Sequence, residues 1–422
     1  MIRSKVLACA FTCCPPGKPG FTGGEDLLGW NILAQIARYH DVWVLTNAED
    51  QASVEEGLRE SGLESINFHY IGLPSWMKPF LRFQGAHQFY YLIWQIVAWF
   101  AARRLHREIG FDLFHHVTYA NDWMGSFIGA YIAIPYVRGP GGGGHRTPKG
   151  FESEYPIGGR IWEKVRSFSQ WLFRHEPVFV RGQSRARAIL VCNNEAELVA
   201  SKKWGSKTKL FPVSGISSED LATRQQSQTD GKFRVITAGS LIRVKGFGLA
   251  IKGFREFARE HPEANLAIIG DGPELPRLTN IVKHSGISNQ IHFLGELPRD
   301  QLLGEMGGSD VFLFPSLRDG GGTVVVEAMG LGKPVICLDA GGPGMHITQE
   351  CGVKITPQSP QQVVDDIAIA LEDLYQNTDL REQLGRSARK RAEELYHWDR
   401  LGDRLRNIYD RALDLDDTAR ED

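Results

Sequence analysis

Short apolar runs alternate with longer amphipathic stretches through the first half of the chain. Residues 26–38 place their apolar side chains at the spacing of a helix that buries one face. Such alternation is typical of a parallel sheet whose strands are connected by helices. The short runs that we predict to be strands lie at residues 6–11, 41–46, 66–73, 111–117 and 134–137.

The pattern is interrupted at residues 206–232, which are polar and poor in large apolar side chains. We interpret this stretch as a linker followed by a loop. A helical pattern over 248–259 and further strand-like runs follow, so a second doubly wound α/β domain is predicted, and ligands of such domains bind at the carboxyl edges of the sheets. These later strands are predicted at residues 233–239, 266–270, 291–295, 311–315 and 334–338.

The composition is that of a folded globular protein. Of the 422 residues 42% are hydrophobic and 23% charged, and the formal net charge is −2, which argues against disorder and against a dedicated nucleic-acid binder. The six cysteines include no CxxC pair for zinc and fit a reducing cytoplasm. The N-terminal apolar run is too short for a secretory signal, so a cytoplasmic protein is expected.

Two segments have an alternative interpretation as membrane contacts. Residues 83–102 carry no charged side chain, but polar residues interrupt them, so they suit either a helix in the core or in a groove, or a helix in the membrane interface. Residues 160–187 hold seven lysines and arginines among aromatic side chains. They suit either an amphipathic helix with a solvated face or a patch for anionic lipid head groups.

The most informative segment is FPSLRDGGGTVVVEAMGLGKPVI, residues 314–336. A predicted strand ends at Pro315, three glycines follow Asp319, and the next helix contains Glu327. Glycines let the backbone approach a ligand closely, and the first turn of a helix offers free N–H groups and a positive dipole end. The segment therefore predicts a site for a phosphate or for sugar hydroxyls. The two carboxylates would bind the hydroxyls.

Two further turns of the second domain carry chemistry. Lys245, in AGSLIRVKGF, suits phosphate charge at a strand end. Gly272, in IIGDGPELPRL, makes a tight turn, but the third glycine of a dinucleotide fingerprint is missing, which disfavours a dehydrogenase. A P-loop NTPase is disfavoured because Pro334 stands where Ser or Thr is required.

Four consecutive glycines occur in YVRGPGGGGHRTP, residues 136–148. Each glycine adds conformational entropy to the unfolded chain, so we expect a loop here and not an element of the core. The loop either binds an acceptor through its backbone or is a flexible surface connection.

Together these segments resemble the retaining nucleotide-sugar glycosyltransferases of the GT-B fold, family 4 (glycosyl transferases group 1). Residues 314–336 are similar to the family's Glu-x7-Glu signature, with Asp319 in the first acidic position. Residues 238–247 are similar to its G-R-L-x-x-x-K-G, with Ser240 in place of the usual arginine and Arg243 close by. Residues 268–278 are similar to its G-x-G turn.

The resemblance implies an α/β GT-B fold, in which two doubly wound Rossmann-like domains face a central cleft. The first domain, which binds the acceptor, would comprise residues 1–213. A C-terminal helix over about 396–422 would cross back onto it. The second domain, residues 214–395, would bind the nucleotide-sugar donor.

The resemblance also implies roles for single residues. Asp319 would contact hydroxyls of the donor sugar, Glu327 the nucleotide ribose, and Lys245 the donor diphosphate. The nucleobase would pack beside Leu294. The complete donor site implied by the family is Gly23, Gly24, Ser240, Arg243, Lys245, Gly272, Leu294, Asp319, Gly320, Gly321, Gly322, Thr323 and Glu327.

The N-terminal half carries weaker matches. FTGGEDLL, from residue 21, is similar to the family's opening, in which the Gly23-Gly24 turn begins a helix beside donor phosphate and acceptor. FDLFHHVTY, residues 111–119, is similar to a strand end with an active-site histidine, a place taken by His115 or His116. A histidine pair at a strand end also suits the core, so both interpretations stay open.

The resulting hypothesis is a retaining transferase that moves a hexose-type sugar from a nucleoside diphosphate sugar to a glycan or lipid-linked acceptor in bacterial surface polysaccharide or glycolipid synthesis. No cofactor, metal or nucleic acid is expected to take part. Residues 80–110 and 160–187 would contact the inner face of the cell membrane. The alternatives are a nucleotide-sugar epimerase or hydrolase of the same fold, and an inactive partner subunit, since Ser240 and Asp319 depart from the family pattern.

Overall fold

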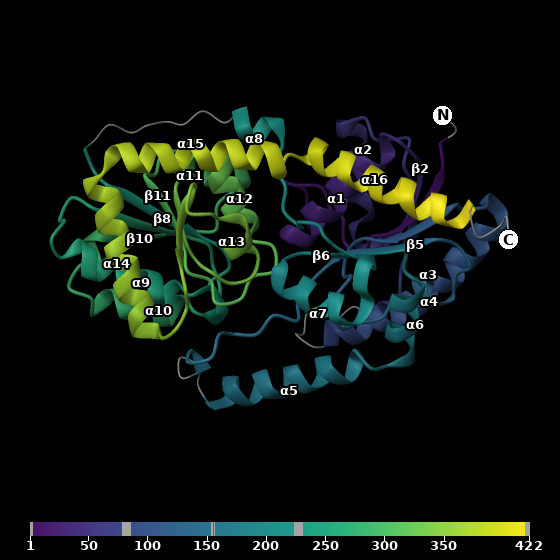
Figure 1. Cartoon of the computed structure of the whole chain (residues 1–422), viewed down its shortest axis with the longest axis horizontal. Coiled ribbons are helices and arrows are strands. Elements are labelled where there is room, and N and C mark those ends of the chain that lie inside the picture. Colours follow the sequence, from purple (N-terminus) through teal and green to yellow (C-terminus); the bar gives the residue numbers. More distant parts are fainter. Residues whose placement is uncertain (1–2, 78–85, 153–154, 156, 223–230, 418–422) are drawn as a thin grey trace. The chain divides into compact units, whose positions relative to one another are not determined.

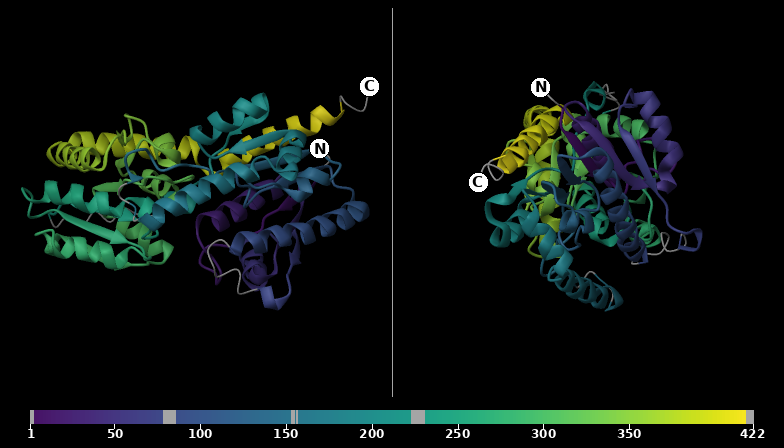
Figure 2. Two further views of the ribbon diagram at one scale, coloured as in Figure 1. Left: turned by 90° about the horizontal axis from the view of Figure 1, so that it is seen from below. Right: turned by 90° about the vertical axis from the view of Figure 1, so that its right-hand side faces the viewer.

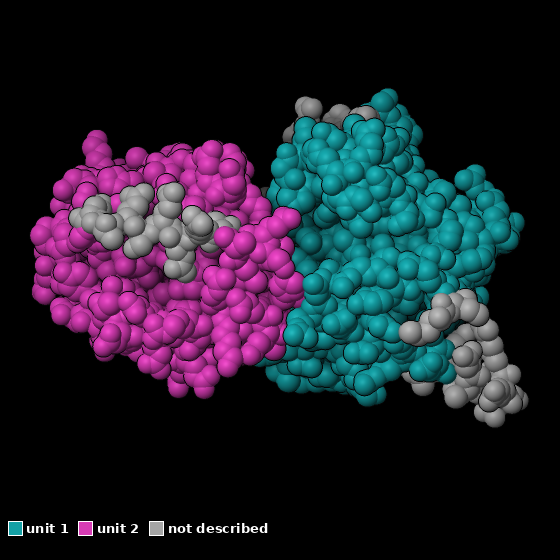
Figure 3. All heavy atoms as spheres, turned by 90° about the horizontal axis from the view of Figure 1, so that it is seen from above, with its two compact units in different colours: residues 1–144, 166–213, 398–422 teal, residues 145–165, 214–397 magenta. Residues whose placement is uncertain are grey.

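The computed structural model describes residues 3–77, 86–152, 155, 157–222 and 231–417. The chain forms two compact units, coloured separately in Figure 3. Unit 1 comprises Met1–Gly144, Arg166–Val213 and Trp398–Asp422, and unit 2 comprises His145–Val165 and Ser214–His397. Residues 145–165, which the sequence analysis places in the first domain, thus pack with the second unit.

Unit 1 is built on a seven-stranded parallel sheet of order β3-β2-β1-β4-β5-β6-β7 (Figure 1). The five strands predicted for this half are all present. The sequence analysis missed β6 and β7, and β7 lies inside the polar stretch that was predicted to be a linker. The strands are β1 Lys5–Cys9, β2 Asp41–Asn47, β3 Asn67–Ile71, β4 Leu113–His116, β5 Tyr136–Gly141, β6 Ala188–Val191 and β7 Thr208–Leu210.

Helices cover both faces of this sheet, and alternate residues of β1 enter two separate cores. Val6 and Ala8 pack with α1 and α16, whereas Leu7 and Cys9 pack with α3 and α4. The C-terminal helix therefore belongs to the core of unit 1, as the GT-B fold requires (Figures 1 and 2). The helices are α1 Gly24–Ala37, α2 Gln51–Ser61, α3 Ala86–Ile109, α4 Phe127–Tyr131, α6 Pro177–Arg185, α7 Asn194–Trp204 and α16 Trp398–Asp417.

Unit 2 contains a six-stranded parallel sheet of order β10-β9-β8-β11-β12-β13, also with helices on both faces (Figure 1). All five strands predicted for this half are confirmed, and β13 was missed. The strands are β8 Arg234–Ala238, β9 Asn265–Ile269, β10 Ile291–Gly295, β11 Val311–Phe314, β12 Val335–Leu338 and β13 Gly352–Ile355. The helices are α8 Ser218–Ala222, α9 Phe247–Ala258, α10 Leu275–Lys283, α11 Arg299–Gly307, α12 Thr323–Gly330, α13 Gly341–His346, α14 Pro360–Gln376 and α15 Thr378–Leu395.

The remaining helix, α5 Ile157–Phe173, is divided between the units: residues 157–165 belong to unit 2 and residues 166–173 to unit 1. Among the described side chains of α5, Gln170 alone is buried and Phe173 is half-buried, whereas the other large apolar side chains of this helix are exposed. α3 is different, because Tyr90, Tyr91 and Trp94 of this helix are fully buried. The described part of residues 83–102 is therefore a helix with one face in the core. None of the helices in the described residues has the length and apolar character needed to cross a bilayer.

The glycine-rich segment corrects a prediction. Gly139 and Gly141 belong to β5 and are buried in the sheet, where a loop had been expected. A Cβ at Gly139 would lie 2.2 Å from the Leu190 carbonyl oxygen, and a Cβ at Gly141 would lie 2.0 Å from that of Ala120. These glycines are required because neighbouring backbone passes too close for any side chain. The loop begins only after Gly141.

Candidate functional site

The sheet order of unit 2 places the candidate site residues together. The chain runs from β8 outward to β9 and β10 on one side, and then from β11 outward on the other, so β8 and β11 flank the switch point. Ligands of open α/β sheets bind at the carboxyl edge beside such a point. Lys245 follows β8 and Asp319 follows β11, and their side chains form an ion pair there.

Asp319 is held by its own loop as well as by Lys245. Its Oδ1 accepts hydrogen bonds from the backbone N–H groups of Gly321 (3.1 Å) and Gly322 (2.8 Å). Burial by itself would raise the pKa of Asp319, but the Lys245 charge and these hydrogen bonds outweigh it and hold the pKa below its ordinary value. Asp319 is therefore a carboxylate. The N–H groups that were expected to receive a phosphate are directed at this carboxylate instead.

Two close backbone approaches fix the position of Lys245. Gly246 has φ +73°, and a Cβ there would lie 1.9 Å from the carbonyl oxygen of Pro315, at the end of β11. The turn after β8 can therefore reach β11 only with glycine at this position. Gly272 plays a similar part on the other side, since its Cβ would lie 2.7 Å from the Leu241 carbonyl oxygen.

Glu327 lies in a second ionic cluster of unit 2. It is buried in α12, and its carboxylate accepts a hydrogen bond from Arg299, which also donates to Asp220 at 3.0 Å. Burial raises the pKa of Glu327, although the Arg299 charge opposes the shift. Arg299 and Asp220 were missed by the sequence analysis. Arg299 follows β10 as the first residue of α11, and position at a strand end was the one signal available for it.

The remaining predicted donor residues of unit 2 differ in accessibility. Ser240 is exposed after β8, and Leu294 is exposed on β10. Arg243 forms an ion pair with Glu274 at 3.0 Å, so its charge is already matched. Thr323 begins α12, and its hydroxyl lies 3.1 Å from that of Ser214.

The glycine loop has a support that the sequence analysis missed. The Gly321 carbonyl oxygen accepts hydrogen bonds from the Ser214 hydroxyl at 2.9 Å and from His346 Nε2 at 2.5 Å. Burial lowers the pKa of His346 to about 4, so its ring is neutral at pH 7 and Nε2 is the protonated nitrogen. Gly322 has φ +61° and leads into α12. The loop beside Asp319 is thus fixed by side chains from two other segments.

The sheet of unit 1 has its own switch point, between β1 and β4. The predicted Gly23-Gly24 turn begins α1 there, and Gly23 has φ +121°. Asp26 was not predicted; it is buried and accepts hydrogen bonds from the backbone N–H groups of Cys14 (3.0 Å) and Thr22 (2.8 Å). Asp26 thus ties the loop after β1 to the start of α1.

His115 and His116 are both buried at the end of β4. His115 Nε2 lies 2.6 Å from the Gly139 carbonyl oxygen, which can only accept, so Nε2 donates and Nδ1 accepts from the Tyr409 hydroxyl at 2.6 Å. His116 Nε2 lies 2.9 Å from the Tyr91 hydroxyl. Burial lowers the pKa of His115 to about 4 and that of His116 to about 3. Both rings are neutral and serve the core in this structure.

A different histidine lies at this edge. His87 Nε2 is 2.8 Å from the hydroxyl of Tyr119, and the two rings stack with centroids 5.4 Å apart. Tyr119 follows β4 and has φ +55°, the one positive φ of a non-glycine residue in the described chain. Its backbone N–H points at Glu25, 3.4 Å away. Strained backbone at a switch point makes Tyr119 a candidate functional residue, and sequence alone gave no signal for it.

The described residues contain no group of three or more His, Cys, Asp or Glu side chains arranged to hold a metal ion. Two doubly wound units, with the C-terminal helix in the core of the first, are the architecture of the GT-B fold.

Comparison with known proteins agrees with this fold. Residues 219–391 match the family described as Glycosyl transferases group 1. An uncharacterized glycosyltransferase of Methanocaldococcus jannaschii is 25% identical over 343 residues, 77% of this chain and 83% of that protein. The crystal structure of Anabaena HepE with UDP and glucose shares the fold, with a TM-score of 0.62 at 18% identity over 97% of this chain and all of that one.

A second relative is matched over a shorter region. The GDP-mannose-dependent monoacylated α-(1-6)-phosphatidylinositol monomannoside mannosyltransferase of Corynebacterium glutamicum is 28% identical over 195 residues. These residues are 44% of this chain and half of that protein.

Proposed function

We propose that this protein is a retaining glycosyltransferase that moves a hexose-type sugar from a nucleoside diphosphate sugar to an acceptor hydroxyl. The Lys245–Asp319 pair at the switch point of unit 2 carries this proposal, because it places a cation and a carboxylate side by side on a glycine loop. A diphosphate needs the first and sugar hydroxyls need the second. The family match covers both residues.

Each residue then has a chemical task. Lys245 leaves its ion pair with Asp319 and binds the donor diphosphate instead. There it stabilises the negative charge that develops on the diphosphate as the glycosidic bond breaks. Asp319 accepts hydrogen bonds from the sugar hydroxyls, held in place by the Gly321 and Gly322 N–H groups. Glu327 gives up part of its interaction with Arg299 and binds the ribose of the nucleotide. Asp220 remains paired with Arg299 and neutralises its charge.

Retention of the anomeric configuration follows from the leaving group's part in the reaction. In the proposed step the acceptor oxygen attacks the anomeric carbon on the face from which the diphosphate departs. The departing phosphate oxygen takes the acceptor's proton, so atoms and charge balance without a protein nucleophile. Neither a metal nor another cofactor takes part in this proposal.

The acceptor is proposed to be a glycan or a lipid-linked sugar of a bacterial surface polymer or glycolipid, met at the inner face of the membrane. Support comes from α5, where Ile161, Val165 and Phe168 follow one another on one face and each is more than half exposed. α3 adds exposed Phe89 and Phe100. The corynebacterial relative is named for a phosphatidylinositol mannoside acceptor, which is a membrane lipid.

Donor use is tested by nucleotide release from a panel of UDP-, GDP- and ADP-sugars without acceptor. We expect slow release from one donor, lost in Asp319→Ala and Lys245→Ala but kept in Asp365→Ala, a control for the exposed surface of α14. HepE binds UDP and glucose, so UDP-glucose is the first donor to test. An epimerised sugar in the product would instead establish an epimerase. Tight nucleotide binding without release, even with candidate acceptors, would favour an inactive partner subunit.

Membrane contact is tested by sedimentation with vesicles that contain anionic lipid. Replacing Ile161 and Phe168 together by glutamine should abolish sedimentation, because both side chains would enter the interface. The matched control is Ile369→Gln on α14, an equally exposed isoleucine outside the proposed surface. Equal loss in the control, or no loss in the α5 variant, would contradict this part of the proposal.

A further inference from the structure

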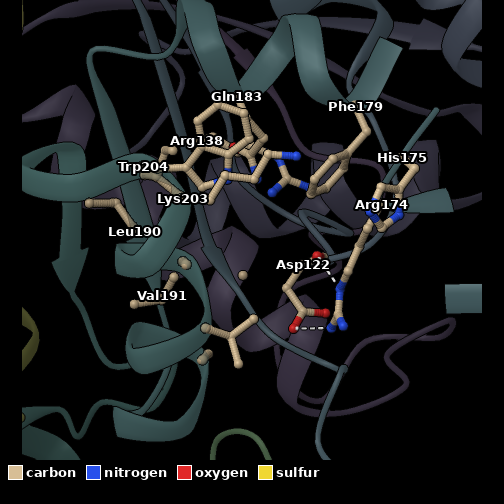
Figure 4. Close-up of a pocket in the computed structure, with 15 residues that line it drawn as sticks. Asp122, Arg138, Arg174, His175, Phe179, Gln183, Leu190, Val191, Lys203 and Trp204 are labelled. Atoms are coloured by element: carbon tan, nitrogen blue, oxygen red, sulfur yellow. Dashed lines mark hydrogen bonds and ion pairs between the residues drawn. The ribbon is translucent and has the colours of Figure 1, made fainter. Parts of the chain in front are cut away.

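A pocket of about 140 Å³ lies in unit 1 between β5, β6, α6 and α7 (Figure 4). Nothing in the proposed donor chemistry uses it, because its lining residues belong to other elements than the glycine turn of α1. Figure 4 shows the Arg138 guanidinium beside the Phe179 ring and the Asp122–Arg174 ion pair at another side of the pocket.

Arg138 is the first unusual feature of this pocket. It is only 3% exposed, and its guanidinium donates hydrogen bonds to the carbonyl oxygens of Asn121 and Met124 (2.7 Å to the second). It also lies 5.3 Å from the Phe179 ring centroid. Within the described part of the chain, no carboxylate forms an ion pair with Arg138. Buried cations are normally paired, so Arg138 is a buried positive charge of the pocket wall that no carboxylate pairs directly.

Gln183 is the second unusual feature of this pocket. It is 4% exposed on α6, lines the same pocket, and its Oε1 has no hydrogen-bond partner. A buried amide oxygen without a donor costs about 1–3 kcal/mol. A ligand that suits the pocket must therefore bring both an anionic oxygen for Arg138 and a hydrogen-bond donor for Gln183. The monoanion of a phosphate monoester has both, because it keeps one hydroxyl. Since the second pKa of the monoester lies near 6, binding of this form at pH 7 takes up a proton.

The rest of the pocket is mostly apolar. Val191, Ala196 and Trp204 line it, and Val199 lines it while being 54% exposed, so this side reaches the surface. Lys203 stands beside Trp204, with its ammonium 5.0 Å from the ring centroid. The volume is comparable to a cavity of roughly 150 Å³ that holds benzene, which suffices for a phosphate and its first methylenes.

We propose that this pocket binds an alkyl phosphate monoester. The phosphate lies against Arg138 and Gln183, and the first methylenes lie against Trp204 and Val199. The remaining chain leaves over the surface of α7, where Leu198 is 61% exposed. The site is separate from the donor site, so it can exist whether or not the proposed transferase activity is correct.

The test is calorimetric titration of the full chain with hexyl phosphate, with hexanol and inorganic phosphate as partial ligands. We expect one site that binds hexyl phosphate at least about tenfold more tightly than either fragment, since each fragment loses one half of the contacts. Hexanol binding as tightly as hexyl phosphate would overturn the proposal. So would inorganic phosphate binding as tightly, and that result would mean an anion site without an apolar part.

Two variants locate the binding. Gln183→Glu places a carboxylate in the pocket with Arg138, so it should weaken hexyl phosphate binding at least about tenfold without lowering the melting temperature. Ala200→Phe fills the pocket from α7, where Ala200 lines it, and leaves both polar residues unchanged. The matched control is Gln51→Glu on α2, an exposed glutamine of the same unit. Unchanged affinity in both pocket variants would overturn the assignment.

Two further measurements on Ala200→Phe distinguish a bilayer lipid from a lipid-linked acceptor as the source of the phosphate. If the ligand is a bilayer lipid, this variant sediments less with vesicles of phosphatidic acid than wild type does, and equally with phosphatidylcholine. If the ligand is part of a lipid-linked acceptor, the variant raises the KM for a hexyl-phosphate-linked sugar acceptor and leaves the KM for the nucleotide sugar unchanged. A variant that changes neither would overturn the assignment to a lipid phosphate.

Discussion

At the scale of single residues, the two acidic positions of the signature segment have different surroundings. Asp319 is paired with a lysine and two backbone N–H groups at the edge of the sheet. Glu327 is buried and paired with Arg299, which Asp220 also contacts. Removing a charge therefore tests a ligand contact at Asp319, but at Glu327 it also disturbs an ionic cluster.

Glu327→Gln is expected to lower the rate of sugar transfer at least about a hundredfold while the fold persists, because the amide keeps the shape and loses the charge that would hold the ribose. Transfer rate and melting temperature are to be measured together. Asp220→Asn is the matched control, since it removes the other carboxylate from Arg299. Equal loss of activity in both variants would mean that Glu327 acts only through Arg299. An unchanged transfer rate in Glu327→Gln would contradict the assignment of Glu327 to the donor site.

His115 makes stability depend on pH. Burial lowers its pKa to about 4, whereas the unfolded ring titrates near 6.5. Between these values the unfolded state binds a proton that the folded state does not, so stability falls as the pH is lowered. This residue should cost about 2 kcal/mol between pH 7 and pH 5. Melting temperatures at both pH values should fall less for His115→Gln than for wild type, and equal falls would contradict the buried neutral ring.

At the scale of elements, the turn between β8 and α9 decides where Lys245 stands. Gly246→Ala should cost more than about 3 kcal/mol, because a side chain is strained at φ +73° and its Cβ would meet the Pro315 carbonyl oxygen at 1.9 Å. Gly286→Ala is the matched control: φ is +81°, but nothing lies within 4 Å of the Cβ. That variant should cost only about 1–2 kcal/mol.

Melting temperature and nucleotide affinity measure this difference. The Gly246 variant should also bind UDP more weakly, because the displaced turn carries Lys245 with it. Similar destabilisation in both variants would mean that backbone strain, and not the contact between the two turns, sets the cost.

The sequence predicted the elements better than it predicted their contacts. Ten strands were located because each is a short apolar run, whereas β7 was missed because its three residues include one exposed lysine in a polar stretch. The turns predicted to bind the donor were chosen from glycines and charges next to strand ends, and their assignment to a donor stays a prediction. Arg299 and Tyr119 required the structure. His115 and His116 were candidates from the sequence, for the active site or for the core, but their burial and hydrogen bonds depend on residues far apart in the chain, such as Tyr409 beside His115.

At the scale of the whole molecule, the first and the last described segments of the chain, which start at Arg3 and stop at Asp417, belong to the same unit. Unit 2 is therefore inserted into unit 1. Its main part, Ser214–His397, precedes helix α16, and its smaller part, His145–Val165, interrupts the first 213 residues. Trp398, Leu401 and Leu405 of this helix lie in the core of unit 1. Unit 1 cannot complete that core until the last element has been synthesised, whereas unit 2 has all of its own strands by then.

Truncation after His397 tests this dependence. It removes five buried core side chains, four of them large, including Tyr409, whose hydroxyl bonds His115. Each large core side chain contributes roughly 2–5 kcal/mol, which in sum exceeds the stability of a typical domain. Hydrogen exchange should show lost protection in β1, β2 and β4 but persistent protection in β8, β9 and β11. A chain ending at Asp417, which retains α16, is the control and should match wild type. Protected unit 1 strands in the chain ending at His397 would show that this unit folds without α16.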